Sequence, residues 1–238
     1  MNEPFLNRSR NFCDACTVRN RAICSDLDND EIAALNAIGQ RRHLAAGENL
    51  LWEGEDAVVV ANVVEGLLKL STSTADGKEQ ILGLAFPADF IGRPFGQSTP
   101  YSVEALTDVL VCVFRRTDFD RFAREHPSLE HKLLERTLTE LDRTRKWMLL
   151  LGRMTAEQRV ATFLLDLSSR FPSDDQAGDL ADGFELKLSR GQIADVLGLT
   201  IETVSREFTK LKKAGIVSLP NRREVAIEDR EALEDLAS

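Results

Sequence analysis

Two kinds of hydrophobic pattern divide the chain near residue 122. Between residues 41 and 122 the apolar residues fall in short runs that are separated by glycines. These runs span 49–52, 58–64, 67–72, 80–85, 101–105 and 109–114. Short apolar runs with regular turn signals are typical of antiparallel sandwiches and rolls. We therefore expect an antiparallel β-roll here, preceded by a short helix over residues 28–39.

Beyond residue 122 the apolar residues recur at helical spacing. A helix over 128–152 has one apolar stripe, because two leucines and a methionine lie seven residues apart and two further leucines flank them. Charged residues occupy its other faces, which argues against a buried helix. We expect this helix to join two domains and to pair with a second copy of the chain. The predicted dimer interface is Leu134, Leu138, Leu141, Met148 and Leu151.

If Leu134, Leu141 and Met148 occupy one of the two core positions of a heptad repeat, the other core position falls at residues 137, 144 and 151. Two of these three residues are threonines, Thr137 and Thr144. We call this contact line the seam. Polar residues at such positions weaken a coiled coil. A weak seam makes pairing conditional, since a few kcal/mol from elsewhere in the chain then decides whether two copies pair.

Helix signals near the C-terminus predict a DNA-binding motif. Ser189 caps a short helix that ends at Gly198, and Thr200 caps a second helix that Gly215 closes. Two capped helices around a tight turn outline a helix-turn-helix, and the two apolar runs after Gly215 predict a β-hairpin wing.

The second of these helices carries side chains that suit base recognition. Glu202, Ser205 and Arg206 share one face near its N-terminal end. Arginine can donate twice to guanine, glutamate can accept from cytosine, and serine can reach either kind of base edge. Residues 189–223 contain seven basic and three acidic residues, a local charge of about +4, whereas the whole chain carries −9. The alternative is a helical hairpin in which Glu202 and Arg206 form an ordinary surface ion pair.

Four cysteines need a separate explanation. Cys13, Cys16 and Cys24 form a C-x2-C-x7-C arm, and Cys112 lies in the apolar run LVCVF. Paired cysteines and a third within reach can turn their sulfurs toward one metal site, and Cys112 is the candidate for the fourth ligand. Spacing alone leaves an iron-sulfur cluster, zinc and no metal as open alternatives.

Composition bounds the location and the size of the protein. No stretch approaches the roughly 20 apolar residues of a membrane span, and the first residues lack the apolar run of a signal peptide. We expect a cytoplasmic protein without membrane partners, in which cysteines rarely form structural disulfides. A chain of 238 residues is long enough for two domains, each with its own core.

The order of a β-roll, a long helix and a winged helix-turn-helix resembles the CRP/FNR superfamily of transcription regulators. The run LGLTIETVSREF over 197–208 resembles the FNR branch. The resemblance implies that Glu202, Ser205 and Arg206 read a TTGAT-type half-site of double-stranded DNA. A homodimer then reads a palindrome whose half-sites lie about one helical turn apart.

The same resemblance implies a cofactor. FNR-type oxygen sensors hold a 4Fe-4S cluster on an N-terminal cysteine trio and one cysteine of the roll, which correspond to Cys13, Cys16, Cys24 and Cys112. The seven residues between the second and third cysteines are similar to FnrL- and FnrN-type members. The resemblance further implies DNA binding by the cluster-loaded dimer in low oxygen, weaker binding after oxidation, and contact with RNA polymerase.

Other ligands fit the pattern less well. A cyclic-nucleotide site needs a glutamate after the glycine and an arginine before the serine of its phosphate-binding segment, but this chain has Arg93 and Tyr101 there. A haem site or structural zinc remains an alternative within the same class of regulators. An enzyme of the cupin kind needs several converging histidines, and the chain contains only His43, His126 and His131. We expect no enzyme activity.

These expectations combine into an α+β fold. The predicted parts are a cysteine-bearing arm over 1–26, an antiparallel β-roll over 27–126, a dimerisation helix over 127–152 and a winged helix-turn-helix domain over 153–238.

Overall fold

The computed structural model describes residues 12–73, 79–170, 183–221 and 223–238. It divides into two compact units, Met1–Glu140 and Leu141–Ser238, and the boundary falls inside the long helix α3 (Pro127–Arg153). Each unit is described by itself. Among the described helices none is both long and apolar enough to cross a membrane.

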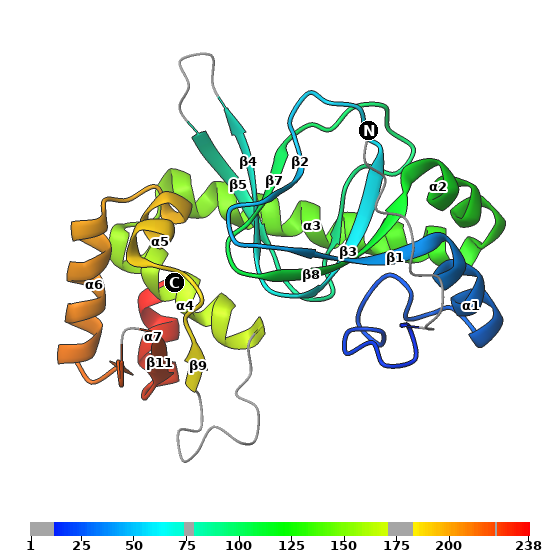
Figure 1. Ribbon diagram of the computed structural model, residues 1–238. Coiled ribbons are helices and arrows are strands. Elements are labelled where there is room, and N and C mark those ends of the chain that lie inside the picture. The colour runs from blue at the N-terminus through cyan, green and yellow to red at the C-terminus, as the bar shows by residue number, and fades with distance from the viewer. Residues whose placement is uncertain (1–11, 74–78, 171–182, 222) are drawn as a thin grey trace. The chain divides into compact units, whose positions relative to one another are not determined.

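The first unit is an antiparallel β-roll with helices at one end (Figure 1). Its two four-stranded sheets have the orders β1-β8-β3-β6 and β2-β7-β4-β5. The strands are β1 (Gly39–Leu44), β2 (Asn49–Leu51), β3 (Val59–Glu65), β4 (Leu68–Ser73), β5 (Glu79–Ala85), β6 (Phe90–Ile91), β7 (Ser102–Ala105) and β8 (Val109–Arg115). The expected antiparallel β-roll is confirmed.

Strand β8 separates two hydrophobic cores because successive side chains of a strand point to opposite faces. Val109, Val111 and Val113 face the core between the two sheets. Cys112 and Phe114 face a second core, which also contains the arm after Phe12, helices α1 (Asn29–Ile38) and α2 (Arg116–Glu125), and the first turns of α3. The cysteine of the roll therefore lies on the face that meets the arm.

Helix α1 agrees with the predicted helix over 28–39. Asp28 caps it and Glu31 completes the capping box, which satisfies backbone N–H groups at both ends of the first turn. Helix α2 was not predicted, since the region through residue 122 was expected to belong to the roll. Phe119, Phe122 and Ala123 are its buried positions, and they recur at the helical spacing of three and four residues.

The second unit contains the end of α3, the helix-turn-helix and a small sheet of order β10-β11-β9. Its elements are α4 (Ala156–Arg170), β9 (Gly183–Glu185), α5 (Arg190–Leu197), α6 (Ile201–Lys213), β10 (Val217–Ser218), β11 (Glu224–Ile227) and α7 (Arg230–Ala237). The predicted wing is the β10-β11 hairpin, in which Val217 pairs with Ile227. Helix α7, which buries Leu233, was not predicted. The loop expected over 172–183 lies almost wholly outside the described residues.

Candidate functional site

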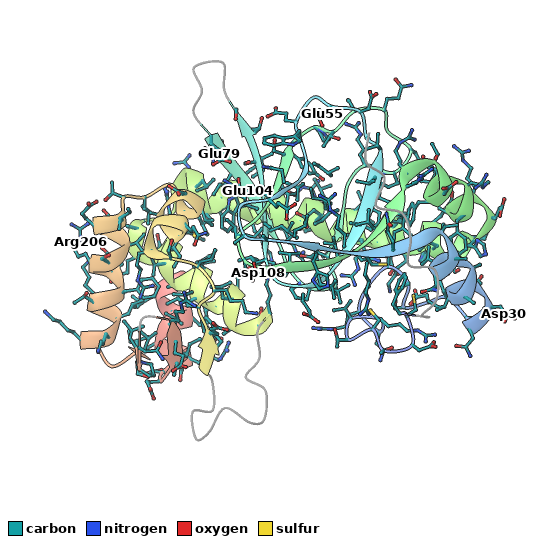
Figure 2. All side chains as sticks on the ribbon, in the orientation of Figure 1. Asp30, Glu55, Glu79, Glu104, Asp108 and Arg206 are labelled. Carbon is teal, nitrogen blue, oxygen red and sulfur yellow. The ribbon has the colours of Figure 1, made fainter. Side chains whose placement is uncertain are left out.

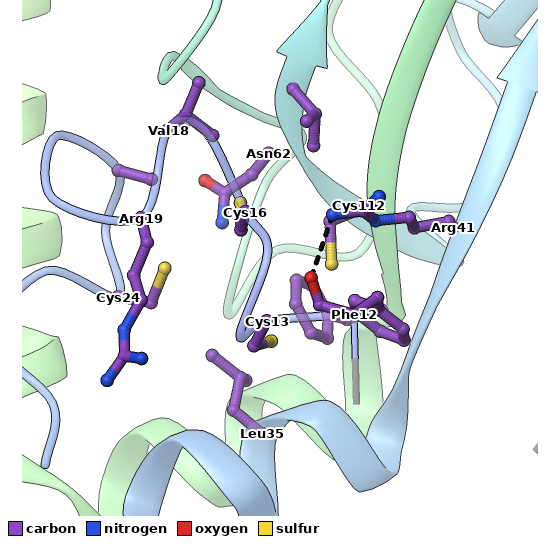
Figure 3. Close-up of a pocket in the computed structure, with 13 residues that line it drawn as sticks. Phe12, Cys13, Cys16, Val18, Arg19, Cys24, Leu35, Arg41, Asn62 and Cys112 are labelled. Atoms are coloured by element: carbon purple, nitrogen blue, oxygen red, sulfur yellow. Dashed lines mark hydrogen bonds between the residues drawn. The ribbon is translucent and has the colours of Figure 1, made fainter. Parts of the chain in front are cut away.

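All four cysteines line one pocket of the first unit (Figure 3). Cys13, Cys16 and Cys24 come from the arm, and Cys112 comes from β8. Each is a free thiol. The other lining residues are mainly apolar, with three polar exceptions: Arg19, Arg41 and Asn62. Two segments almost 90 residues apart in the chain therefore meet around one cavity, as the cysteine pattern predicted.

The arm reaches the pocket through a series of turns. The backbone carbonyl oxygens of Cys13, Cys16 and Cys24 each accept a hydrogen bond from an N–H group three residues later, at 3.3 Å in all three cases. Arg41, which lies opposite Cys112 in the β1-β8 ladder, donates a hydrogen bond of 2.9 Å to the carbonyl oxygen of Phe12. The guanidinium of Arg41 also lies 5.6 Å from the centre of the Phe12 ring. Arg41 thus ties the start of the arm to the roll.

Burial favours the protonated form of three of these thiols, those of Cys13, Cys24 and Cys112. Burial raises the pKa of Cys13 to about 11, the neighbouring Cys24 and Cys16 add to this rise, and the positive charges of Arg19 and Arg41 oppose it. Burial also raises the pKa of Cys24 and Cys112. A metal that binds here must therefore displace protons from the sulfurs.

The metal-binding donors of the pocket are all thiols. The described lining contains four thiols and no histidine or carboxylate. Across the described parts of the chain, no three histidine, cysteine, aspartate or glutamate side chains lie close enough to hold one metal ion. Zinc binds sulfur at about 2.3 Å, so a single zinc needs four closely gathered thiolates. An iron-sulfur cluster is also bound by four cysteines, so the number and type of the donors in this pocket match its ligand set.

The helix-turn-helix has the predicted caps. Ser189 accepts a hydrogen bond from the backbone N–H of Gln192, whose side chain completes the capping box of α5. Gly198 ends α5 with a φ of 61°, a left-handed conformation that favours glycine. Thr200 caps α6 by accepting from the backbone N–H of Thr203. The turn between the helices is thus defined by the left-handed Gly198 and the Thr200 cap, while the Ser189 cap begins α5.

Glu202, Ser205 and Arg206 are exposed on α6, whereas Val204 and Phe208 are buried on its opposite side. Figure 2 shows Arg206 projecting from α6 away from α4 and α5. Hydrogen bonds from the backbone N–H of Glu202 and from the Thr200 hydroxyl lower the pKa of the Glu202 carboxyl. This carboxylate is therefore ionised at neutral pH and can only accept hydrogen bonds, as recognition of a cytosine amine requires.

Glu207 is the exception in the apolar face of α6. Its side chain is only 3% exposed, and Lys210 binds its carboxylate at 2.8 Å while Arg206 lies 3.5 Å away. Phe208, the next residue, is buried as well. Arg190 stacks 3.3 Å from the centre of the Phe208 ring, and burial lowers the pKa of Arg190 to about 10, which leaves it charged. The sequence pattern did not reveal this stacking.

The predicted dimer face remains uncovered in the single chain. Leu134, Leu138 and Met148 are 55%, 54% and 70% exposed, and Leu141 is exposed as well. Leu151 is half-buried instead. Leu149, which was not predicted to belong to the face, is 55% exposed.

The residues considered above for nucleotide and haem sites make contacts with nearby parts of the chain. Burial raises the pKa of Tyr101, which also forms a hydrogen bond with the backbone of Gly92. His126 is hydrogen-bonded to the carbonyl oxygen of Phe122 at 2.6 Å and stacked on the Phe122 ring. His131 lies 3.4 Å from Glu135 on the same helix.

Comparison with known proteins agrees with both parts of this picture. The family model described as "Cyclic nucleotide-binding domain" matches residues 41–126, and the model "Crp-like helix-turn-helix domain" matches residues 158–236. The chain is 41% identical over 222 residues to the transcriptional activator protein FnrL of Cereibacter sphaeroides, a match that covers 91% of this chain and 88% of FnrL. The chain belongs to the CRP/FNR family of transcription regulators. It is therefore a DNA-binding regulator and not an enzyme.

Two further relatives agree with this family assignment. The transcriptional activator protein Anr of Pseudomonas protegens is 34% identical over 234 residues, covering 96% of this chain and 94% of Anr. The solved structure of FixK2 from Bradyrhizobium japonicum superposes with a TM-score of 0.77 at 33% identity, covering 84% of this chain and 98% of FixK2. The predicted fold class and family are confirmed.

Proposed function

We propose that this regulator is an oxygen-responsive transcriptional activator whose four cysteines hold one 4Fe-4S cluster. The observation that carries the proposal is that Cys13, Cys16, Cys24 and Cys112 line a single pocket. The similarity to activators of the FnrL and Anr type supports it. When bound, the cluster supplies a group that oxygen can oxidise.

Packing suggests how the pocket acts on the long helix. Cys24 and Cys112 share one hydrophobic core with Leu129 and Leu133 from the first turns of α3. Lys132 of α3 also lies 3.3 Å from the Asp26 carboxylate, two residues after Cys24. Anything that orders or releases the arm therefore changes what supports α3 just before the exposed leucines begin. We propose that arm order decides whether two chains pair along this face.

The second unit then does the DNA reading. In a homodimer, two copies of α6 meet two half-sites of a TTGAT-type palindrome, with Glu202, Ser205 and Arg206 at the base edges. The exposed position and the ionised carboxylate of Glu202 support these roles. The bound dimer contacts RNA polymerase, as activators of this family do.

Anaerobic purification followed by metal analysis tests the cofactor. We expect about four iron atoms and four sulfides per chain, and an absorption in the visible range that fades when air is admitted. Stoichiometric zinc without sulfide would favour a structural-zinc regulator of the same fold, and a metal-free chain would refute the cluster.

A further inference from the structure

Asn62 is a buried amide in the middle of an apolar strand. It lies in β3, whose other buried residues are apolar, and its side chain is only 3% exposed. The Oδ1 atom of Asn62 accepts no hydrogen bond from any residue that the structure describes. Buried amides are nearly always hydrogen-bonded, because burial removes their hydrogen bonds to water, and this costs free energy unless the protein replaces them. An unpartnered one at this position indicates a partner that the chain itself does not supply.

The direction of the Asn62 side chain identifies where that partner binds. In the β3-β8 ladder Asn62 lies directly opposite Cys112, and directly opposite residues of an antiparallel pair point to the same face. Asn62 lines the pocket together with all four cysteines (Figure 3). The amide therefore faces the space that the proposed cluster occupies, beside the one ligand that comes from the roll.

The chemistry of the pocket selects the donor end of the amide. Thiolate and sulfide sulfurs of a cluster carry negative charge and accept hydrogen bonds, and a side-chain amide has two N–H donors. Rotation of the amide by half a turn exchanges Oδ1 and Nδ2, so the occupant of the pocket decides which end points inward. An anionic occupant favours Nδ2.

We propose that the side-chain amide of Asn62 is a positioning residue that donates a hydrogen bond to a sulfur atom of the cluster and thereby slows its oxidation by air. This inference rests on the proposed function. A hydrogen bond to sulfur withdraws electron density from the cluster, which disfavours loss of an electron. Without the bond, the electron is lost more readily.

The first test compares wild type with Asn62→Leu, which keeps the branched shape and removes the donors. Both proteins are loaded anaerobically, and the decay of the visible absorption is followed after a fixed amount of dissolved oxygen is added. We expect decay that is roughly tenfold faster in Asn62→Leu, the size of effect that one charge-assisted hydrogen bond produces.

Thermal unfolding of the metal-free proteins separates this role from a structural one. The empty pocket leaves the Oδ1 atom of Asn62 without a hydrogen bond from the described residues, so replacement of the amide by leucine should raise the unfolding midpoint of the metal-free chain, by about 2 °C. A structural role predicts a lower midpoint and an unchanged decay rate. A lower midpoint with unchanged decay would overturn the inference.

Asn36 offers a matched control. It is a second amide whose buried Oδ1 lacks a hydrogen bond within the described residues, but it lies on α1 and does not line the pocket. Asn36→Leu should leave the decay rate at the wild-type value. An equal acceleration in Asn36→Leu would show that the effect is unspecific and would overturn the inference.

A second pair of variants covers the possibility that leucine disturbs the strand. Asn62→Thr and Asn62→Val have nearly the same shape, and both suit a β-strand, but only threonine can donate. We expect slower decay in Asn62→Thr than in Asn62→Val, and equal rates in this pair would overturn the inference. A wild type without iron and sulfide would overturn the proposed function as well, whereas a loaded wild type with equal rates in every variant would overturn the Asn62 role alone.

Discussion

The cysteine pocket and the reading face of α6 are opposite kinds of site. Glu202, Ser205 and Arg206 lie within five positions of one helix, and all three side chains are exposed to solvent. The pocket is instead assembled from the arm and β8, and Cys112 is buried with a raised pKa. The proposed reading face is formed by neighbouring residues of one helix, whereas the pocket brings two distant segments together around its thiols.

This difference makes the pocket the natural place for regulation. A site that is complete without its ligand changes little when the ligand leaves. The arm is held by turns, by its apolar residues in the second core and by the Arg41 hydrogen bond to Phe12, and we propose that an occupant of the pocket adds to its order. The four predictions that follow sharpen the comparison, beginning with the largest effect.

Removal of one pocket ligand should abolish metal binding. Cys112→Ala leaves three thiols, and we expect nearly complete loss of iron and sulfide after anaerobic purification. Val111→Ala is the matched control, because Val111 is the next residue of β8 and faces the other core. We expect Val111→Ala to cost about 2 kcal/mol of stability while iron is retained. Full iron in Cys112→Ala would contradict the four-cysteine site.

Removal of one side chain that contacts bases should change the preference for particular DNA sequences more than the affinity for DNA in general. Arg206→Ala should cost about 1 to 3 kcal/mol at a matched half-site and relax the preference for guanine. Lys210 still pairs with the buried Glu207, so the fold of α6 is retained. Lys213→Ala should instead weaken binding to all sequences and reduce its salt dependence. Equal loss on matched and mismatched duplexes would place Arg206 on phosphate.

The turn that orients α6 should be sensitive to a single methyl group. Gly198 has a φ of 61°, so Gly198→Ala should destabilise the chain by about 1 kcal/mol. Gly152 lies in the last turn of α3 with open space around its Cα, and Gly152→Ala should stabilise by about 0.5 kcal/mol. Urea unfolding measures both. The same sign of change in both variants would refute the assigned role of the turn.

The smallest expected effect concerns the charge on Glu202. Thr200→Ala removes one of the hydrogen bonds that lower the pKa of Glu202, so that pKa should rise toward the ordinary carboxyl value. A lowered pKa contributes stability above the unfolded-state value, and this contribution is lost as the pH falls through the folded-state value. Wild type should thus lose in acid only the pH-dependent part of its advantage over Thr200→Ala, because the cap that Thr200 provides to α6 does not titrate. An NMR titration of Glu202 checks the shift, and an unchanged pKa would contradict it.

Local signals predicted the second unit better than the first. Ser189, Gly198 and Thr200 act within a few residues of themselves, so their caps and turn are readable from spacing, and the structure has them as predicted. Helix α2 was missed because it follows β8 directly, without a separating glycine or proline. Helix α7 has Leu233 as its buried position, too weak a pattern to stand out.

The chemistry of the pocket was only partly predictable. The cysteines could be recognised as candidate ligands from the sequence, because cysteine is a common metal ligand in proteins. Asn62 was not, since an asparagine between Ala61 and Val63 has no distinctive spacing, and only the register with Cys112 reveals which way it points. The pairing of the buried Glu207 with Lys210 depends on side-chain geometry and could not be predicted from spacing.

DNA affinity before and after exposure to air tests the central claim most directly. The probe is a labelled duplex with a palindrome of TTGAT-type half-sites, titrated with the anaerobically purified wild type and with Cys112→Ala. The account predicts that air lowers the affinity of the wild type by roughly tenfold or more, while Cys112→Ala binds weakly throughout. Equal affinity of the wild type before and after air, with loss of its visible absorption, would contradict it.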